Sequence, residues 1–143
     1  MWGGGNTEAY IKKADELNIS DCVSFPGWIS GAEKENLLRN ATVFILPSYN
    51  EGLPVSMLEA MSYGLACVVT DVGGIPSVIN NGENGLLIEP GNIEMLTNTI
   101  CMLLDDQQRI KEIGEHAYNT IVNEFDIKKN LKDLISIYFK LAG

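Results

Sequence analysis

The chain has 143 residues, 45% of them hydrophobic and 20% charged, a composition that is typical of a folded domain and excludes disordered or collagen-like chains. Lys and Arg number 10 against 19 Asp and Glu, and the net charge of -9 repels polyanions, so we expect no nucleic acid partner. No apolar run approaches the ~18 residues of a membrane span and no leader segment opens the chain, which predicts a cytoplasmic protein.

The cysteines and the single histidine offer no pattern of metal ligands. Cys22, Cys67 and Cys101 lie far apart in apolar runs, which predicts buried free thiols in a reducing compartment. His116 lies in a helical segment without a partner at ligand spacing, so we expect it to be solvated or to cap a helix. Without an Asp-x-Asp pair or a histidine cluster, we expect no metal and no cofactor.

The first third of the chain alternates helical and extended patterns. It predicts helices at residues 7–17 and 30–39 and strands at residues 23–25 and 42–46. Asn6 or Thr7 caps the first helix, and Ser30 with Glu33 forms a capping box for the second. The strand at 42–46 is apolar throughout, as expected of a strand covered on both faces of a parallel sheet.

The remainder continues the alternation and then becomes helical. It predicts a helix at residues 54–63, a strand at 66–70, a short helix at 76–79 and a strand at 85–88. Three apolar stripes, which start at Ile93, Ile110 and Ile127, predict C-terminal helices. Met57, Met61, Met95 and Met102 are expected to fill the core.

Strands separated by helices predict an α/β fold with a Rossmann-like parallel sheet, flanking helices and a helical C-terminal third. We expect one partial domain over residues 1–143, with the sheet in residues 1–91 and the C-terminal helices in residues 92–143. Ligands of such sheets bind beyond the carboxyl ends of the strands. The loops of interest therefore follow Phe25, Leu46 and Thr70.

The loop after Leu46 carries residues suited to binding an anion and hydroxyl groups. The amides of Gly52 and Leu53 lie at a helix start, where unpaired N–H donors and the helix dipole favour phosphate. Glu51 precedes this turn, and Glu59 follows eight positions later. A carboxylate accepts hydrogen bonds from both hydroxyls of a diol. The combination fits a nucleotide sugar.

The same residues have a purely structural interpretation. Acidic side chains near the start of a helix often complement the helix dipole, and Glu59 fits a solvated helix face equally well. The spacing of Glu51 and Glu59 alone does not separate the two interpretations.

A longer collinear pattern resembles the C-terminal donor-binding domain of retaining GT-B glycosyltransferases of the family 4 type. Its segments are Glu51–Met61, Gly64, Val68–Pro76 and Asn81–Leu87. The match as a whole covers nearly the entire chain, in order and with the expected gaps. The resemblance implies transfer of a hexosyl group from a UDP-sugar or GDP-sugar donor to an acceptor. The alternatives are a nucleotide-sugar-binding or interaction module without catalysis and a GT-B-type sugar-nucleotide epimerase.

The resemblance also implies roles for individual residues. Glu51 would bind hydroxyls of the donor sugar as the catalytic residue, and Gly52, Leu53 and Pro54 would form the turn that binds the sugar and diphosphate. Glu59 would hold the ribose diol. Two further sites are implied elsewhere, with Gly5 near the phosphates and Gly27, Trp28 and Ile29 against the base. For Trp28, a rim aromatic that covers the sheet edge is an equally good interpretation.

The chain departs from the family pattern in two ways. Ser77 stands where members commonly have a glutamate, so a charge-dependent role of that position is in doubt. Nothing corresponds to the N-terminal domain, which would hold a carbohydrate or lipid-linked acceptor, or to the first strand and helix of the donor domain. Two absent strands would lie between residues 23–25 and 43–46, and the exposed sheet edges predict self-association.

Overall fold

The computed structural model describes residues 7–125, which fall into two compact units that divide between Arg39 and Asn40. The predictions for Gly5, for Asn6 as a cap and for the stripe that starts at Ile127 lie outside the described residues. The expectation of one domain over residues 1–143 stays a prediction.

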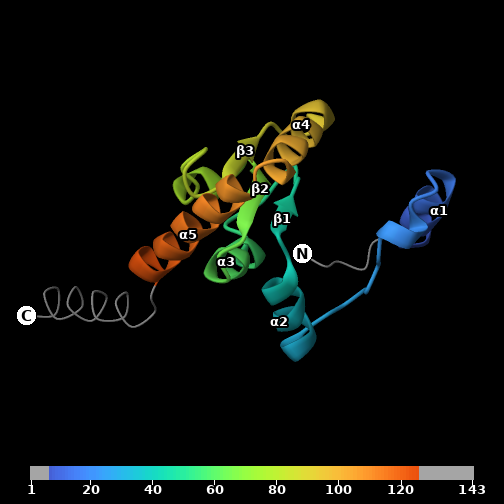
Figure 1. The fold of residues 1–143 in the computed structure, drawn as a ribbon, viewed down its shortest axis with the longest axis horizontal. Coiled ribbons are helices and arrows are strands. Elements are labelled where there is room, and N and C mark those ends of the chain that lie inside the picture. Colours follow the sequence, from blue (N-terminus) through green and yellow to red (C-terminus); the bar gives the residue numbers. More distant parts are fainter. Residues whose placement is uncertain (1–6, 126–143) are drawn as a thin grey trace, which may run out of the picture. The chain divides into compact units, whose positions relative to one another are not determined.

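The first unit contains the two predicted helices. Helix α1 spans Thr7–Glu16, and helix α2 spans Gly31–Asn40 and begins directly after Ser30, at the predicted boundary. Asn18 follows α1 with a φ of 55°, the left-handed conformation that Asn tolerates at a helix end. A short 3-10 helix, η1, spans Ser20–Cys22. Both predicted helices are confirmed (Figure 1).

The strand expected at residues 23–25 is wrong. The backbone is extended at Val23, with φ -124° and ψ 131°, but no strand among the described residues pairs with this segment. A strand requires a neighbour to accept and donate its backbone hydrogen bonds. Val23 and Phe25 are each 38% exposed, so their apolar side chains do not supply the burial that the pattern indicated.

The second unit contains a sheet of three parallel strands in the order β1-β2-β3. Strand β1 spans Val43–Leu46, β2 spans Ala66–Thr70 and β3 spans Leu86–Ile88. In register, Ile45 of β1 lies opposite Val68 of β2. The parallel strands with their flanking helices confirm the Rossmann-like α/β class (Figure 1).

Three helices pack against this sheet, and a 3-10 helix precedes the last strand. Their bounds are Val55–Ser62 for α3, Ile75–Ser77 for η2, Ile93–Leu104 for α4 and Gln107–Glu124 for α5. The side chains of Asn92 and Asp106 cap α4 and α5 by accepting from backbone N–H groups three residues on. The helix predicted at residues 76–79 is instead the 3-10 turn η2, because Pro76 stands within it and the chain turns at once toward β3.

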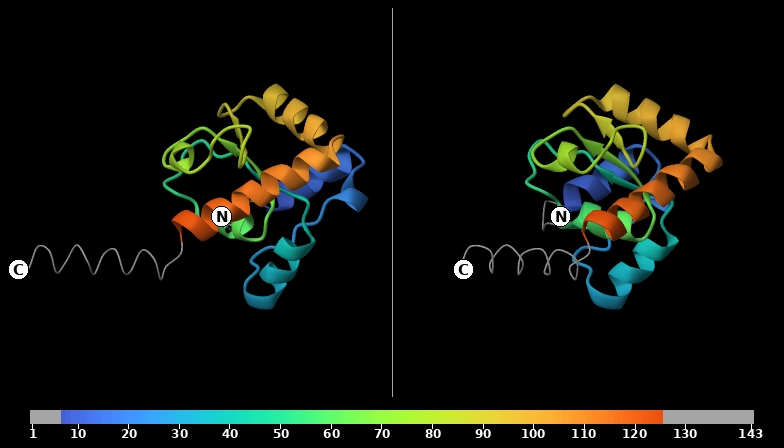
Figure 2. Two further views of the ribbon diagram at one scale, coloured as in Figure 1. Left: turned by 60° about the vertical axis from the view of Figure 1, so that its left-hand side comes forward. Right: turned by 90° about the vertical axis from the view of Figure 1, so that its left-hand side faces the viewer.

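The core lies around β2, in which every residue is buried. Ala66 and Val68 pack with Ile88 of β3 and with residues of α4 and α5, among them Leu103 and Ile113. Helix α5 runs beside α3 and β2 (Figures 1 and 2). Met57 and Met61 of α3 are completely buried, as predicted. No helix within residues 7–125 is long and apolar enough to cross a membrane.

Several apolar side chains predicted to be buried are exposed. Ile45 of β1 is 40% exposed, because among the described residues β1 has a neighbouring strand on one edge only. On α4, Ile93 is 76% and Met102 is 70% exposed, since the buried face of the helix is the one that carries Leu103. In β1 and α4 the sequence shows apolar residues, but it does not show which of their side chains have neighbours to pack against.

The cysteine prediction is correct for one thiol and wrong for two. Cys67 is buried in β2, whereas Cys22 and Cys101 are exposed, Cys22 at the end of η1 and Cys101 on α4. All three are free thiols. Burial raises the pKa of the Cys67 thiol to about 12, because the thiolate would lose its hydration there.

Candidate functional site

The loop between β1 and α3 holds four of the predicted donor-binding residues, Glu51–Pro54, at the carboxyl end of the sheet. Glu51 is half-buried in this loop, and Gly52 and Leu53 are exposed after it. The Ser48 hydroxyl donates a hydrogen bond to Oε1 of Glu51 at 2.7 Å. One carboxylate oxygen of Glu51 is therefore held by a side chain of the same loop, that of Ser48, which lies three residues earlier.

The turn after β2 supports the Glu51–Gly52 backbone from behind. The Gly74 N–H donates to the Gly52 carbonyl at 2.7 Å. A Cβ atom on Gly73 would lie 1.8 Å from the Glu51 carbonyl oxygen, and Gly73 has a φ of 56°, so both space and conformation require glycine there. Two loops that follow neighbouring strands thus meet backbone to backbone.

This contact orients the amides at the start of α3. In a trans peptide the carbonyl and the following N–H point in opposite directions. Because the Gly52 carbonyl faces Gly74, the Leu53 N–H faces away from that turn. Within the described residues, neither the Gly52 nor the Leu53 amide donates a hydrogen bond. They remain available to an anion, in keeping with the predicted role.

The N-terminus of α3 lies directly beyond these amides. Pro54 is the residue before the helix, with φ -71° and ψ 117°, rather than within its first turn as predicted. It provides no side-chain cap, so no side chain of the preceding residue neutralises the positive end of the α3 dipole, although the Met57 N–H donates to the Pro54 carbonyl at 3.1 Å. Glu59 lies in the second turn of α3 and is half-buried. Glu51 and Glu59 therefore lie on different elements, the loop and the helix.

Thr70, the last residue of β2, links the sheet to the loop. Its side chain is fully buried, and Oγ1 donates to the Ser48 carbonyl at 2.6 Å. The Leu46 carbonyl lies at 3.4 Å from the same oxygen. The loop that carries Glu51 is consequently anchored at two points, to the central strand at Thr70 and to the turn after it at Gly74.

A cleft of about 180 Å³ opens beside this loop. Its walls come from the ends of β1, β2 and β3 and from the β3–α4 connection, and Thr70 contributes to its lining. The Tyr49 ring packs on Gly91, where a Cβ atom would lie 3.1 Å from the ring. Glu51 and Glu59 do not line this cleft.

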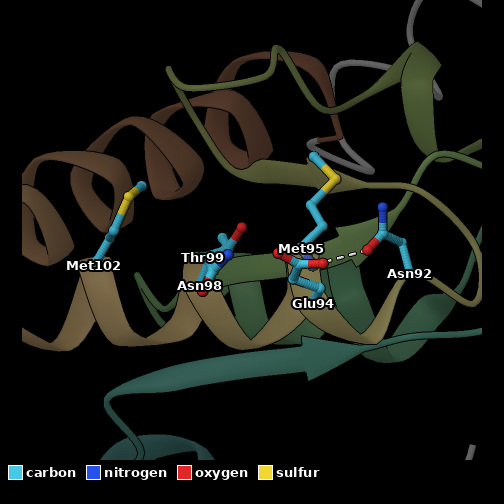
Figure 3. Close-up of a pocket in the computed structure, with 6 residues that line it drawn as sticks. All are labelled: Asn92, Glu94, Met95, Asn98, Thr99 and Met102. Atoms are coloured by element: carbon cyan, nitrogen blue, oxygen red, sulfur yellow. Dashed lines mark hydrogen bonds between the residues drawn. The ribbon is translucent and has the colours of Figure 1, made fainter.

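A second hollow, of about 330 Å³, lies along the surface of α4 (Figure 3). The figure shows the Asn92 cap bonded to Met95 at one end and Met102 at the other. Glu94 is the only charged side chain among its six lining residues. No predicted site residue lies here.

The residues predicted for the base belong to the first unit. Gly27 has a φ of 73°, Trp28 is 81% exposed and Ile29 is 6% exposed. Their role stays a prediction, as does that of Gly5 outside the described residues.

His116 is exposed on α5, with Nδ1 3.2 Å from the Glu83 carbonyl oxygen. Within residues 7–125, no three His, Cys, Asp or Glu side chains are grouped to hold a metal ion.

The sequence interpretation missed Ser48 and Thr70 as parts of the site, and it included Gly73 and Gly74 only within the Val68–Pro76 segment of the family pattern. One signal was available for each hydroxyl. Thr70 is the only hydroxyl-bearing residue of an otherwise apolar strand, and it stands at the carboxyl end. Ser48 precedes Glu51 by three residues in a loop, a spacing at which side chains often interact locally.

Comparisons with known proteins show the family and the fold of the chain. The family described as "Glycosyl transferases group 1" matches residues 1–120. The chain is 31% identical over 127 residues to UDP-Gal:alpha-D-GlcNAc-diphosphoundecaprenol alpha-1,3-galactosyltransferase of Escherichia coli, covering 89% of this chain and 32% of that protein. It is 32% identical over 129 residues to N-acetyl-alpha-D-glucosaminyl L-malate synthase of Bacillus anthracis, covering 90% and 33%.

Among solved structures, sucrose-phosphate synthase from Thermosynechococcus elongatus superimposes with a TM-score of 0.84 at 26% identity. The match covers 97% of this chain and 35% of that one. The chain thus spans about a third of the length of the curated relatives described above, at 32% and 33%.

Proposed function

The chain belongs to the Glycosyl transferases group 1 family, and from this premise we propose that it is the donor-binding part of a retaining glycosyltransferase. The enzyme transfers a hexosyl group from a nucleotide-diphosphate sugar to an acceptor. A UDP-sugar or a GDP-sugar serves as donor, without a metal or other cofactor. The name of the Escherichia coli relative, which specifies UDP-Gal, supports a donor of this class.

One observation carries the proposal. The Gly74 N–H holds the Gly52 carbonyl at 2.7 Å, so that the Leu53 amide faces outward beside Glu51 at the uncapped start of α3. Outward amides and a helix N-terminus attract the diphosphate, whose charge grows as the sugar leaves. Pro54 sets the angle at which the helix begins, because its φ is fixed.

The two glutamates bind hydroxyl groups in this proposal. Glu51 keeps Oε2 for the donor sugar while Oε1 accepts from Ser48, since a carboxylate offers about four lone-pair positions. Glu59, one helical turn deeper on α3, binds the ribose diol. A role of Gly5 toward the phosphates and of Gly27, Trp28 and Ile29 toward the base, implied by the family resemblance, belongs to the same proposal.

The remaining partners follow from the same reaction. The acceptor is a carbohydrate or a lipid-linked sugar, held by a further domain. The chain spans only 32% and 33% of two curated relatives, and this supports a separate domain for the acceptor. The three free thiols favour a reducing, cytoplasmic location. Among the described residues no strand pairs with the outer edge of β1, and an unpaired edge of this kind supports self-association of the chain.

The test is isothermal titration of UDP-glucose, GDP-mannose and the matching nucleoside diphosphates against the full-length protein. We expect Glu51→Ala to weaken binding of the nucleotide sugar by on the order of tenfold or more and to spare the diphosphate, because Glu51 contacts only the sugar. Glu59→Ala should weaken both ligands equally.

Glu94→Ala is the matched control, since Glu94 is an exposed acidic residue in the first turn of another helix, α4. It should bind all ligands as the wild type does. Unchanged affinity in both the Glu51 and the Glu59 variants would overturn the site, and a wild type that binds no nucleotide sugar would overturn the proposed function.

A further inference from the structure

A chain of two hydrogen bonds connects the buried strand β2 to the carboxylate of Glu51. Thr70 Oγ1 donates to the Ser48 carbonyl at 2.6 Å, and the Ser48 hydroxyl donates to Glu51 Oε1 at 2.7 Å. Thr70 is 0% exposed, whereas Glu51 is half-buried at the open side of the loop. The bonds thus run from the best-packed strand of the sheet to an accessible functional group.

The loop needs such a connection. Its neighbouring residues Pro47, Tyr49 and Asn50 are exposed, so packing alone does not fix the position of Ser48. A glutamate side chain has three rotatable bonds, and an unrestrained carboxylate samples many orientations. A hydroxyl donor on one oxygen selects among these orientations and leaves the second oxygen to a ligand.

We propose that Ser48 is a positioning residue, which orients the Glu51 carboxylate toward the donor sugar, and that Thr70 positions Ser48 through its backbone carbonyl. The inference rests on the proposed function, because it presupposes that Glu51 binds the sugar. Neither residue contacts the ligand itself. Their effect is to keep Glu51 in the bound orientation before the donor arrives.

The experiment compares two ligands of the full-length protein, the nucleotide sugar that the wild type binds and its nucleoside diphosphate. Ser48→Ala should weaken the nucleotide sugar about tenfold and leave the diphosphate unchanged, because only the sugar depends on Glu51. Ser48→Thr, which retains the hydroxyl, should restore wild-type binding. A general loss of structure would instead weaken both ligands together.

A double-mutant cycle isolates the link to Glu51. In a Glu51→Ala background, Ser48→Ala should have no further effect on sugar-nucleotide affinity, because the group that Ser48 orients is gone. Ser62→Ala is the matched control for the serine. Ser62 is a half-buried serine of α3 whose hydroxyl donates to a backbone carbonyl, so its removal should leave the affinity ratio of the two ligands unchanged.

Thr70→Val tests the second bond at nearly constant volume. We expect a loss of about threefold for the nucleotide sugar, smaller than for Ser48→Ala because the Ser48–Glu51 bond survives in part. Thr97→Val is its control, since the Thr97 hydroxyl also donates to a backbone carbonyl, that of Ile93, but on α4. It should not change the affinity for either ligand.

The outcomes separate this inference from the proposed function. If Glu51→Ala weakens the nucleotide sugar but Ser48→Ala does not, the positioning role is wrong and the function stands. If Glu51→Ala has no effect on a wild type that binds the nucleotide sugar, the positioning role and the sugar-binding role of Glu51 both fail, and the proposed function stands. Should Ser48→Ala not fold by circular dichroism, Ser48→Cys replaces it, because a thiol of similar size is a weak donor, and the same losses are expected.

Discussion

Strands β1 and β2 are neighbours of similar apolar character, yet their surroundings differ. All five residues of β2 are buried, whereas no residue of β1 is classed as buried and Ile45 is 40% exposed. Strand β2 has a parallel neighbour on each side, and β1 has one only on the β2 side among the described residues. An apolar run therefore reports that a strand forms, not how well it is covered.

The difference extends to the loops that follow the two strands. The turn after β2 is packed so closely that neither Gly73 nor Gly74 has room for a Cβ atom against the Glu51–Leu53 backbone. The loop after β1 is largely exposed and is held through its contacts to β2 and to that turn. The predicted site residues Glu51–Leu53 thus follow the less covered strand, and contacts to the well-covered strand and to the turn after it hold their loop.

The largest effect should follow from filling the space behind the loop. Gly73→Ala places a Cβ atom where the Glu51 carbonyl oxygen lies, 1.8 Å away in the present backbone, and imposes a left-handed φ on alanine. We expect unfolding, or a loss of about 4 kcal/mol or more in the free energy of unfolding. Denaturant titration followed by circular dichroism measures it.

Gly82→Ala separates strain from collision. Gly82 lies in the same unit with a φ of 82°, but the nearest atom to its Cβ would be 3.8 Å away. It should therefore lose only the roughly 1–2 kcal/mol that a left-handed alanine entails. Equal losses for the two variants would mean that the two loops are not in contact in solution.

Much of the second unit was predictable because its signals are local. The helix expected at residues 54–63 and the strands expected at residues 42–46 and 66–70 all depend on neighbours in sequence, and α3, β1 and β2 match them closely. The Glu51–Glu59 segment was found in the same way, since a glycine before a helix start is visible in the sequence.

The missed features depend on contacts between distant segments. The Thr70 hydroxyl donates to the Ser48 carbonyl, 22 positions earlier in the chain. The Gly74 N–H likewise donates to the Gly52 carbonyl, so it joins the loop after β2 to the loop after β1. The strand expected at residues 23–25 failed for a related reason, because its pairing needs a partner strand that the pattern itself does not contain. Periodicity indicates which way side chains alternate, but not what lies opposite them.

An intermediate effect compares two residues that are opposite each other in register. Val68→Ala removes two carbons from the fully buried β2, and we expect about 2–3 kcal/mol less stability through lost burial and a small cavity. Ile45→Ala removes three carbons from β1, but we expect about 1 kcal/mol or less, because that side chain is already 40% exposed. Urea unfolding of both variants measures the difference.

Repeating these titrations at tenfold higher protein concentration sharpens the comparison. If the open edge of β1 mediates self-association, the loss caused by Ile45→Ala should grow with concentration, while that of Val68→Ala should grow less. A loss for Ile45→Ala as large as that for Val68→Ala at every concentration would contradict the exposed position of β1. Something within the same chain would then cover it.

The smallest effect uses the thiol in the centre of β2. Burial raises the pKa of Cys67 from 9.0 to about 12, so above pH 9 the unfolded chain ionises this thiol while the folded chain keeps it protonated. Above pH 9 the unfolded state therefore binds fewer protons than the folded state. The free energy of unfolding is unaffected by the ionisation of Cys67 below pH 9 and decreases as the pH rises from 9 toward 12. We expect a decrease of about 1 kcal/mol between pH 8 and pH 10.

Two alanine variants assign that slope to the buried strand. Cys67→Ala removes the titrating group, so its stability should fall less steeply with pH than that of the wild type, whatever its stability at neutral pH. Cys101→Ala removes an exposed thiol of α4 and should keep the wild-type slope. If both variants kept that slope, Cys67 would be accessible to water in solution, and β2 would be no better covered than β1.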